Sequence, residues 1–303
     1  MKAVIATQYG GPEVLQLKEI DKPQPKANEL LIKVRATTIT AADMRMRSFT
    51  VPPLLWLPAR LSLGLTKPKQ PIYGVELAGD VEAIGQDVTR FKIGDPVFAS
   101  TLVANFGAHA EYKCLAEDGL VLVKPQNMTY EEAAAVPTGG AAALRLLRKG
   151  QIGQGQKVLI YGASGSVGTY AVQIAKAYGA EVTGVCSTAH VELVKSLGAN
   201  QVIDYTRQDF SAGGAVYDAI FDTVGKCPKA QCAKALKPNG KFITIAKLST
   251  KQSLEELTVI KELIEAGQVK AVIGRCYPLE EMVEAHRYVD MGHKTGNVVI
   301  TVA

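Results

Sequence analysis

A glycine-rich turn is the part of the sequence whose residue types most clearly suggest chemistry. It joins an apolar run, Lys157–Tyr161, to a helical pattern over Ser166–Tyr178. Glycine lets the backbone turn tightly and approach a pyrophosphate, whose charge is stabilised by N–H groups at the start of the helix. By itself the spacing Gly-x-x-Gly-x-x-Gly would indicate only a tight strand-to-helix turn, but strands and helices continue to alternate around it. We therefore predict a dinucleotide site lined by Gly162, Ala163, Ser164, Gly165, Ser166, Val167 and Gly168.

The residues that follow the next strand bear on the choice of cofactor. An acid at this place usually accepts hydrogen bonds from the ribose hydroxyls of NAD. Here Ser187, Thr188 and His190 follow the run Glu181–Cys186, and no acid occurs before Glu192. A 2′-phosphate would meet two hydroxyls and a partial positive charge, so we predict NADPH rather than NADH. Ser187 and Thr188 could also cap the following helix, and the two interpretations are compatible.

A second cluster of polar residues precedes and occupies a short predicted helix, Ala41–Arg47. We expect the Thr40 hydroxyl to bind an acceptor oxygen or a nicotinamide ribose hydroxyl. Asp43 and Arg47 stand at i, i+4 spacing and could orient the wall of the site. A solvated helix with an ordinary ion pair explains these two residues equally well.

These candidate residues fall in two regions with different patterns. Up to about Val123, short β-type runs are broken by Gly, Pro and Asp. After Pro125, strands alternate with helical patterns, which is typical of a parallel sheet covered by helices. The tail does not continue this alternation. We expect an α/β fold in which residues 1–123 and 274–303 form a β-rich domain and residues 124–273 form an inserted domain with a doubly wound parallel sheet.

Composition and charge exclude several classes of protein. The 303 residues are 47% apolar and 21% charged, which is typical of a globular chain with a full-sized core. The net charge of +5 is spread along the chain, so we expect no nucleic-acid partner. We also expect no membrane partner and a cytoplasmic location, because the apolar stretches are interrupted and no signal-peptide core follows Met1. The five cysteines contain no C-x-x-C pair, as expected for reduced thiols that act as small core residues.

Taken together, several sequence motifs resemble those of the medium-chain dehydrogenase/reductase superfamily, and within it those of the zinc-independent quinone oxidoreductase-like group. They are Gly10–Leu15, Gly74–Gly85, Phe91–Val97, Gly107–Tyr112, Gly162–Gly168, Leu197–Ala199, Val202–Tyr205 and Asp222–Gly225. The resemblance covers nearly the whole chain. It implies a GroES-like catalytic domain, an inserted Rossmann domain, NADPH as cofactor, and hydride transfer in the cleft between the domains. It also implies nucleotide contacts from Thr138, Tyr205, Thr223 and Asn297.

The same resemblance indicates whether the chain has the ligands of a catalytic zinc ion. The metal-dependent alcohol dehydrogenases have Cys where this chain has Thr40, and Gly-His-Glu where it has Gly74-Val75-Glu76. Catalytic zinc needs about three protein ligands, and two of the set are missing. His109, His190, His286 and His293 are not at metal-ligand spacing. We predict no metal, and we expect Glu76 to hold its loop through backbone hydrogen bonds.

Without a metal, conjugated acceptors are the favoured substrates, because they delocalise the charge that a hydride brings. We predict an NADPH-dependent, metal-independent oxidoreductase that reduces quinones or α,β-unsaturated carbonyls. Two departures favour an alternative, an NADPH-binding sensor or partner-binding module with little turnover: Ala142 stands where the family has a Thr near the nicotinamide, and Thr40 replaces an Asn. A zinc-type alcohol dehydrogenase is a less favoured third interpretation.

The resemblance also implies a homodimer formed through an additional strand. The segment Lys247–Ser253 is too short to supply that strand, which argues against the usual dimer. The apolar stretch Leu54–Leu65 offers another surface for association, or its Trp56 could line the acceptor pocket. We expect the Pro-rich stretch Pro52–Pro71, which contains Trp56, to be an irregular flap.

Overall fold

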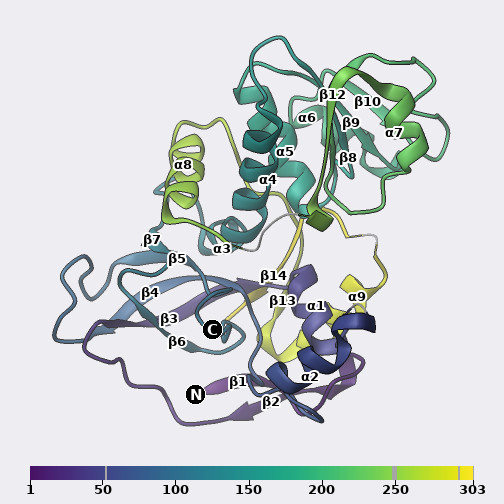
Figure 1. The fold of residues 1–303 in the computed structure, drawn as a ribbon. Helices are drawn as coiled ribbons and strands as arrows, with labels where there is room; N and C mark the ends of the chain where they lie inside the picture. Colours follow the sequence, from purple (N-terminus) through teal and green to yellow (C-terminus); the bar gives the residue numbers. More distant parts are fainter. Residues whose placement is uncertain (52, 248–250, 293, 303) are drawn as a thin grey trace. The chain divides into compact units, whose positions relative to one another are not determined.

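The computed structural model describes residues 1–51, 53–247, 251–292 and 294–302. The chain divides into two compact units (Figure 1): Met1–Thr138 with Ile273–Ala303, and Gly139–Val272. The tail therefore returns to the first unit, as expected from the break in its pattern. The boundary between the units falls inside helix α4 (Pro137–Gly150), later than the predicted boundary at residue 123. The reason is that α3 (Tyr130–Ala134) packs on strands of the first unit.

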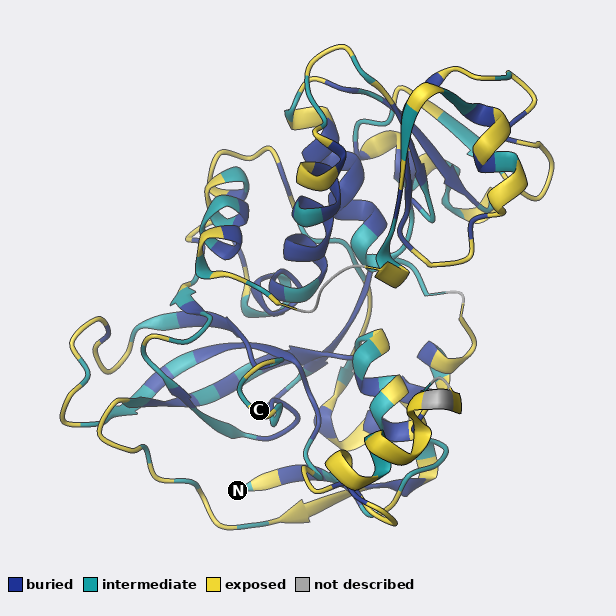
Figure 2. Cartoon of the chain, viewed as in Figure 1, coloured by how far each residue is buried: buried dark blue, intermediate teal, exposed yellow. Residues whose placement is uncertain are grey.

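The first unit is built on a seven-stranded sheet in the order β13-β14-β3-β4-β5-β7, with β6 paired to β3. Its pairs are antiparallel except for β13 with β14. The strands are β3 (Glu29–Thr38), β4 (Glu76–Ile84), β5 (Pro96–Ser100), β6 (Tyr112–Ala116), β7 (Val121–Val123), β13 (Ile273–Pro278) and β14 (Asn297–Thr301). A separate two-stranded sheet pairs β1 (Lys2–Ala6) with β2 (Leu15–Glu19). Figure 2 shows the central strands as largely buried, and their side chains Leu30, Ile32 and Leu77 are completely enclosed.

Short helices follow the strands of this unit. Helix α1 (Ala41–Ser48) begins at a capping box in which Thr40 is the N-cap, and ends at Phe49 in the left-handed conformation. Helix α3 begins at a second capping box on Thr129. Helix α9 (Met282–Asp290) packs on β13 and β14. The stretch predicted as an irregular flap instead contains a short 3-10 turn (Pro53–Leu55) and helix α2 (Trp56–Leu63).

The second unit is a parallel sheet in the order β10-β9-β8-β11-β12. Its strands are β8 (Lys157–Tyr161), β9 (Glu181–Cys186), β10 (Gln201–Asp204), β11 (Tyr217–Asp222) and β12 (Leu236–Thr244). The helices that pack on it include α5 (Ser166–Ala177), α6 (Val191–Ser196) and α7 (Lys229–Ala235), and α8 (Leu254–Glu265) lies farther along the chain. The strand order reverses at β8, so the loops after β8 and β11 lie at the switch point where such sheets bind nucleotides.

The structure does not describe all of the residues on which two of the predictions depend. Residues 248–250 of the segment Lys247–Ser253, and His293, lie outside the described residues. Within the described residues, β12 is the last strand at its end of the parallel sheet. No helix in the described part of the chain has the length and apolar composition needed to cross a membrane.

Candidate functional site

The glycine-rich turn lies between β8 and α5, as predicted. Gly162 has φ +83°, a conformation that strongly favours glycine. A Cβ on Gly168 would lie 2.1 Å from the Gly162 carbonyl oxygen, so the helix can approach the strand this closely only with glycine there. A Cβ on Gly165, the N-cap of α5, would meet nothing nearer than 3.5 Å. The turn therefore presents the first turn of α5 to an open side, which is the arrangement that binds pyrophosphate.

Thr223 fixes this turn from the neighbouring strand. Its hydroxyl lies 2.8 Å from the Tyr161 carbonyl oxygen and 3.2 Å from that of Gly162, and it donates to them. Its backbone N–H also donates to the Tyr161 carbonyl. Thr223, which the resemblance implied as a nucleotide contact, thus joins the ends of β8 and β11 at the edge of the site.

The predicted adenosine end of the site contains a carboxylate that the sequence reasoning missed. The Thr188 hydroxyl donates to Asp204, which is the last residue of β10. Asp204 also accepts from the Thr206 backbone N–H at 2.9 Å and from its hydroxyl at 2.7 Å. These hydrogen bonds hold the pKa of Asp204 below its ordinary value, with Arg207 adding a weaker effect. Asp204 is therefore an anion beside one of the two hydroxyls predicted to bind the 2′-phosphate.

This corrects the premise that no acid lies near the end of the second strand. That premise was drawn from residues consecutive in sequence, whereas β10 pairs with β9 and brings its own carboxyl end to the same edge. Strand order in a parallel sheet is the signal that could have revealed Asp204. Tyr205 follows it with about half of its side chain exposed, and its N–H donates to the Cys186 carbonyl. Ser187 precedes the 3-10 turn Thr188–His190 without a side-chain capping bond.

The predicted catalytic residues of the first unit lie at the two ends of α1. The Thr40 hydroxyl donates to Asp43 Oδ2 at 2.6 Å and accepts from the N–H groups of Ala42 and Asp43. Asp43 is completely buried, and its Oδ1 accepts from the Gly74 N–H at 2.9 Å. Thr40 and Asp43 therefore tie the start of α1 to the loop before β4.

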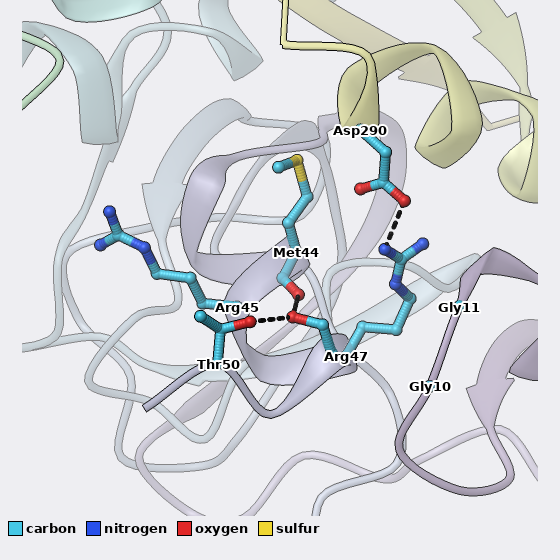
Figure 3. A pocket seen from close by; sticks show the side chains of 8 residues that line it. Gly10, Gly11, Met44, Arg45, Arg47, Thr50 and Asp290 are labelled. Carbon is cyan, nitrogen blue, oxygen red and sulfur yellow. Dashed lines mark hydrogen bonds and ion pairs between the residues drawn. The ribbon is translucent and has the colours of Figure 1, made fainter. Parts of the chain in front are cut away.

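Arg47 does not form the predicted helical ion pair with Asp43. Only 3% exposed, it donates from one terminal nitrogen to Asp290 Oδ2 at 2.6 Å. A solvated helix face is thus excluded for both residues, and each is a buried polar group with a separate partner. Figure 3 shows Arg47 and Asp290 at the wall of an open pocket of about 490 Å³ at the C-terminal end of α1. Its other lining residues are Gly10, Gly11, Met44, Arg45, Ser48 and Thr50.

Glu76 makes one backbone and one side-chain hydrogen bond, and these connect the start of β4 to α4 and β3 instead of holding its own loop as predicted. Its Oε2 accepts from the Thr138 backbone N–H at 2.7 Å, and its Oε1 accepts from the Thr38 hydroxyl. Burial raises its pKa to about 7, although both hydrogen bonds act in the opposite direction. Lys294 is the nearby cation that the sequence did not suggest, and burial lowers its pKa to about 8 against the attraction of Glu76 and Asp43. Asn297 is buried at the start of β14.

Two histidines form a further buried group in this unit. The rings of His109 and His286 lie 6.2 Å apart, and His109 Nε2 lies 3.0 Å from the Thr38 carbonyl oxygen. Neither ring nitrogen of His286 has a hydrogen-bond partner among the described residues. Burial, together with His109 and Arg47, lowers its pKa to about 2. His286 is therefore neutral in the folded protein at ordinary pH.

The donor groups do not fit a catalytic zinc ion. Thr40 is engaged in its capping box, Val75 is a buried apolar side chain, and both oxygens of Glu76 already accept hydrogen bonds. Within the part of the chain that the structure describes, no three His, Cys, Asp or Glu side chains gather as a metal-binding group. The retained carboxylate alone cannot supply the three ligands that such a site needs.

Comparison with known proteins places this arrangement in a family. The family of the alcohol dehydrogenase GroES-like domain matches residues 26–145, and that of the zinc-binding dehydrogenases matches residues 166–285. The human quinone oxidoreductase is 31% identical, over 99% of this chain and 97% of that protein. The chain belongs to the quinone oxidoreductase group of the medium-chain dehydrogenase/reductases. The resemblance read from the sequence is confirmed.

Two further relatives agree with this membership. The NADPH-dependent alkenal/one oxidoreductase of Arabidopsis thaliana chloroplasts is 32% identical, over 99% of this chain and 79% of that protein. The structure of the quinone oxidoreductase from Coxiella burnetii matches with a TM-score of 0.88 and 29% identity, over 100% of this chain and 99% of that one. As a member of the quinone oxidoreductase group, this chain has the GroES-like and Rossmann-type architecture that was predicted.

Within this quinone oxidoreductase-type chain, the predicted site residues fall into two sets. Gly162–Gly168, Ser187, Thr188, His190, Tyr205 and Thr223 belong to the second unit. Thr40, Asp43, Arg47, Thr138 and Asn297 belong to the first. In the first set, hydrogen bonds connect Thr223 to Gly162, and in the second they connect Thr40 to Asp43. Their roles toward cofactor and acceptor remain predictions.

Proposed function

We propose that this chain uses NADPH to reduce quinones or α,β-unsaturated carbonyls by hydride transfer, without a metal. The observation that carries the proposal is the turn Gly162–Gly168, a cradle in which a Cβ at Gly168 would collide with the backbone. The names of the relatives from Arabidopsis thaliana and human supply the class of acceptor. When bound, NADPH supplies the hydride, and the protein supplies position and exclusion of water.

The chain's own residues would contribute in three places. The first turn of α5 would hold the pyrophosphate, and Thr223 would keep that turn in place. Thr188, Tyr205 and Arg207 would contact the adenosine ribose and its phosphate. Thr40 would donate a hydrogen bond to the acceptor or to the nicotinamide ribose only by giving up its hydrogen bond to Asp43. We therefore propose Thr40 as the residue that couples the position of α1 to the bound ligand.

The first test compares NADPH and NADH oxidation with a series of simple quinones and enones, before and after treatment with a chelator. Turnover that prefers NADPH and survives the chelator supports the proposal. NADPH binding without reduction of any acceptor would instead indicate a sensor or partner-binding module. Loss of turnover on chelation, restored by zinc, would overturn the metal-free mechanism.

Two glycine variants separate nucleotide binding from folding. Gly165→Ala has room for its Cβ at an ordinary φ, so its thermal midpoint should match that of the wild type. We expect its NADPH affinity to fall at least about tenfold, because the added methyl group occupies the approach of the pyrophosphate. Gly168→Ala should lose stability as well, because its Cβ would lie 2.1 Å from the Gly162 oxygen.

Calorimetric titration with NADPH and thermal unfolding check both variants. Gly153→Ala is the matched control, because a Cβ there meets nothing within 4 Å. Wild-type NADPH affinity in Gly165→Ala would show that the nucleotide does not lie against this turn.

The remaining expectations concern location and association. We propose a cytoplasmic protein without a nucleic-acid partner, in agreement with the dispersed charge of the chain. We further propose that it does not form a dimer through a strand added beyond β12. Sedimentation of the full chain tests this point: a monomer supports the proposal, whereas a stable dimer would require either another interface or a strand beyond β12.

A further inference from the structure

The loop that follows β11 brings two cysteines together. The sulfur atoms of Cys227 and Cys232 lie 2.7 Å apart, and the two residues are only 7% and 2% exposed. Cys227 precedes Pro228, the N-cap of α7, and Cys232 is the fourth residue of that helix. Apolar side chains commonly pack against each other at these two positions and fix the entry of the chain into a helix. Here both positions carry a thiol.

The backbone on both sides of the sulfur contact is held in place. Asp222 Oδ1 accepts from the Gly225 N–H at 2.8 Å, and Asp222 Oδ2 accepts from the Cys227 N–H at 3.2 Å. The Cys232 N–H donates to the Pro228 carbonyl at 3.0 Å. Ordering of the two backbones keeps the thiols facing each other, so little conformational freedom is left to lose when they react.

We propose that Cys227 and Cys232 form an oxidisable dithiol, a modification site that a hydroperoxide converts into an intramolecular disulfide. One thiolate attacks a peroxide oxygen, so that an S–O bond forms and the O–O bond breaks. The leaving hydroxide takes up a proton and becomes water. The second thiol then attacks the sulfenic sulfur, the S–S bond forms, and the S–O bond breaks to release a second water. Two thiols lose two electrons, and one hydrogen peroxide is reduced to two waters.

The geometry favours this pair over the other cysteines of the chain. A disulfide has an S–S distance of about 2.05 Å, so closure needs a movement of less than about 1 Å. Cys114, Cys186 and Cys276 have no such sulfur neighbour within the described residues. Burial raises the pKa of both thiols of the pair, and Asp222 acts in the same direction. The thiolate is the reacting form, so oxidation should be faster at alkaline than at neutral pH.

Peptide mapping of the intact chain tests the proposal. The reduced protein is treated with hydrogen peroxide, denatured in N-ethylmaleimide and digested with trypsin. Cleavage after Lys226, Lys229 and Lys234 places Cys227 and Cys232 in separate peptides, Cys-Pro-Lys and Ala-Gln-Cys-Ala-Lys. We expect these two peptides to be joined, and only three of the five thiols to react with N-ethylmaleimide. Dithiothreitol should restore all five.

Matched variants assign the bond. Cys227→Ser and Cys232→Ser should each abolish the joined peptide, whereas Cys276→Ser, which removes an exposed cysteine, should retain it. Alkylation of all five thiols after peroxide, or separate overoxidation of the two cysteines, would mean that the pair is only a packing contact. A disulfide from either cysteine to Cys276 would also overturn the assignment. The wild-type map decides the matter even if a serine variant fails to fold.

Discussion

At the scale of single residues, the predicted adenosine end of the nucleotide site contains a carboxylate at the end of β10 that binds a hydroxyl from the turn after β9. Asp204 accepts hydrogen bonds from Thr188 and Thr206, and Arg207 lies 3.6 Å from it. The same hydroxyl cannot donate its proton to Asp204 and to a 2′-phosphate at once. In the proposed binding mode, the 2′-phosphate of NADPH would therefore compete with Asp204 for Thr188, and the two anions would repel each other.

We accordingly expect Asp204→Asn to strengthen NADPH binding. The substitution removes the negative charge that would repel the phosphate and frees the Thr188 hydroxyl, so the Kd for NADPH should decrease about 1.5- to 5-fold. NADH lacks the phosphate, so its Kd should hardly change. Titration of the purified variant with both cofactors measures the two values.

Asp209→Asn provides the control for this comparison. It removes an exposed carboxylate that accepts hydrogen bonds from Ser211 in the same unit. If Asp204→Asn changed the affinities for NADPH and NADH equally, Asp204 would act on the shape of the loop and not on the phosphate.

At the scale of elements, helix α1 shows how one hydroxyl serves both folding and the candidate site. Thr40 closes the capping box with Asp43, and Asp43 binds the Gly74 N–H beyond it. The pattern Thr-x-x-Asp before a helix is visible in the sequence, yet it was interpreted there as catalytic chemistry. The structure shows that every part of the Thr40 hydroxyl already has a partner in the fold.

Replacing Thr40 should therefore lower stability before it affects chemistry. Loss of an N-cap hydroxyl costs about 1 kcal/mol, and Thr40→Ala also removes a hydrogen bond from the buried Asp43. We expect Thr40→Ala to lose about 1–3 kcal/mol in denaturant unfolding. Thr40→Ser keeps the hydroxyl and should stay within about 0.5 kcal/mol of the wild type.

Turnover of the same two variants distinguishes the capping role of Thr40 from a contact with the ligand. If Thr40 also contacts the ligand, kcat of Thr40→Ala should fall under conditions in which the variant is fully folded, and Thr40→Ser should restore it. An unchanged kcat in folded Thr40→Ala would leave this residue a purely structural cap.

At the scale of the whole molecule, two buried groups should give the stability an unusual dependence on pH. The pKa of Glu76 is raised from 4.5 to about 7, so this group binds a proton in the folded state and makes stability fall as pH rises between these values. The pKa of His286 is lowered from 6.5 to about 2, so stability falls as pH decreases below 6.5. Between their ordinary values the two slopes oppose each other.

Single variants should separate the effects of Glu76 and His286 on the pH dependence of the unfolding free energy. From pH 4.5 to 6.5, each group contributes up to about 1.4 kcal/mol per pH unit. Relative to the wild type, Glu76→Gln should make the free energy of unfolding rise with pH, and His286→Gln should make it fall. Urea unfolding at several pH values measures the three curves. Parallel curves for wild type and variants would show that neither group titrates differently on folding.

The sequence by itself determined the elements of the nucleotide-binding unit and the turn that defines it. Strand and helix periodicity is local, and the glycine spacing at Gly162 and Gly168 reflects a local collision that a Cβ would cause. The sequence also predicted that the C-terminal segment belongs to the first unit, because the alternation of strands and helices ends before it. The family membership followed from several sequence motifs taken together.

Only the tertiary structure decided which polar groups meet. Asp204 reaches Thr188 because β10 lies beside β9, and Arg47 pairs with Asp290 across 243 positions of the chain. Burial of Glu76, Lys294 and His286 likewise depends on what packs around them, and that burial sets their pKa values. Periodicity records which face of an element is apolar, but it contains no information about which distant element covers that face. Contacts and desolvation therefore had to come from the fold.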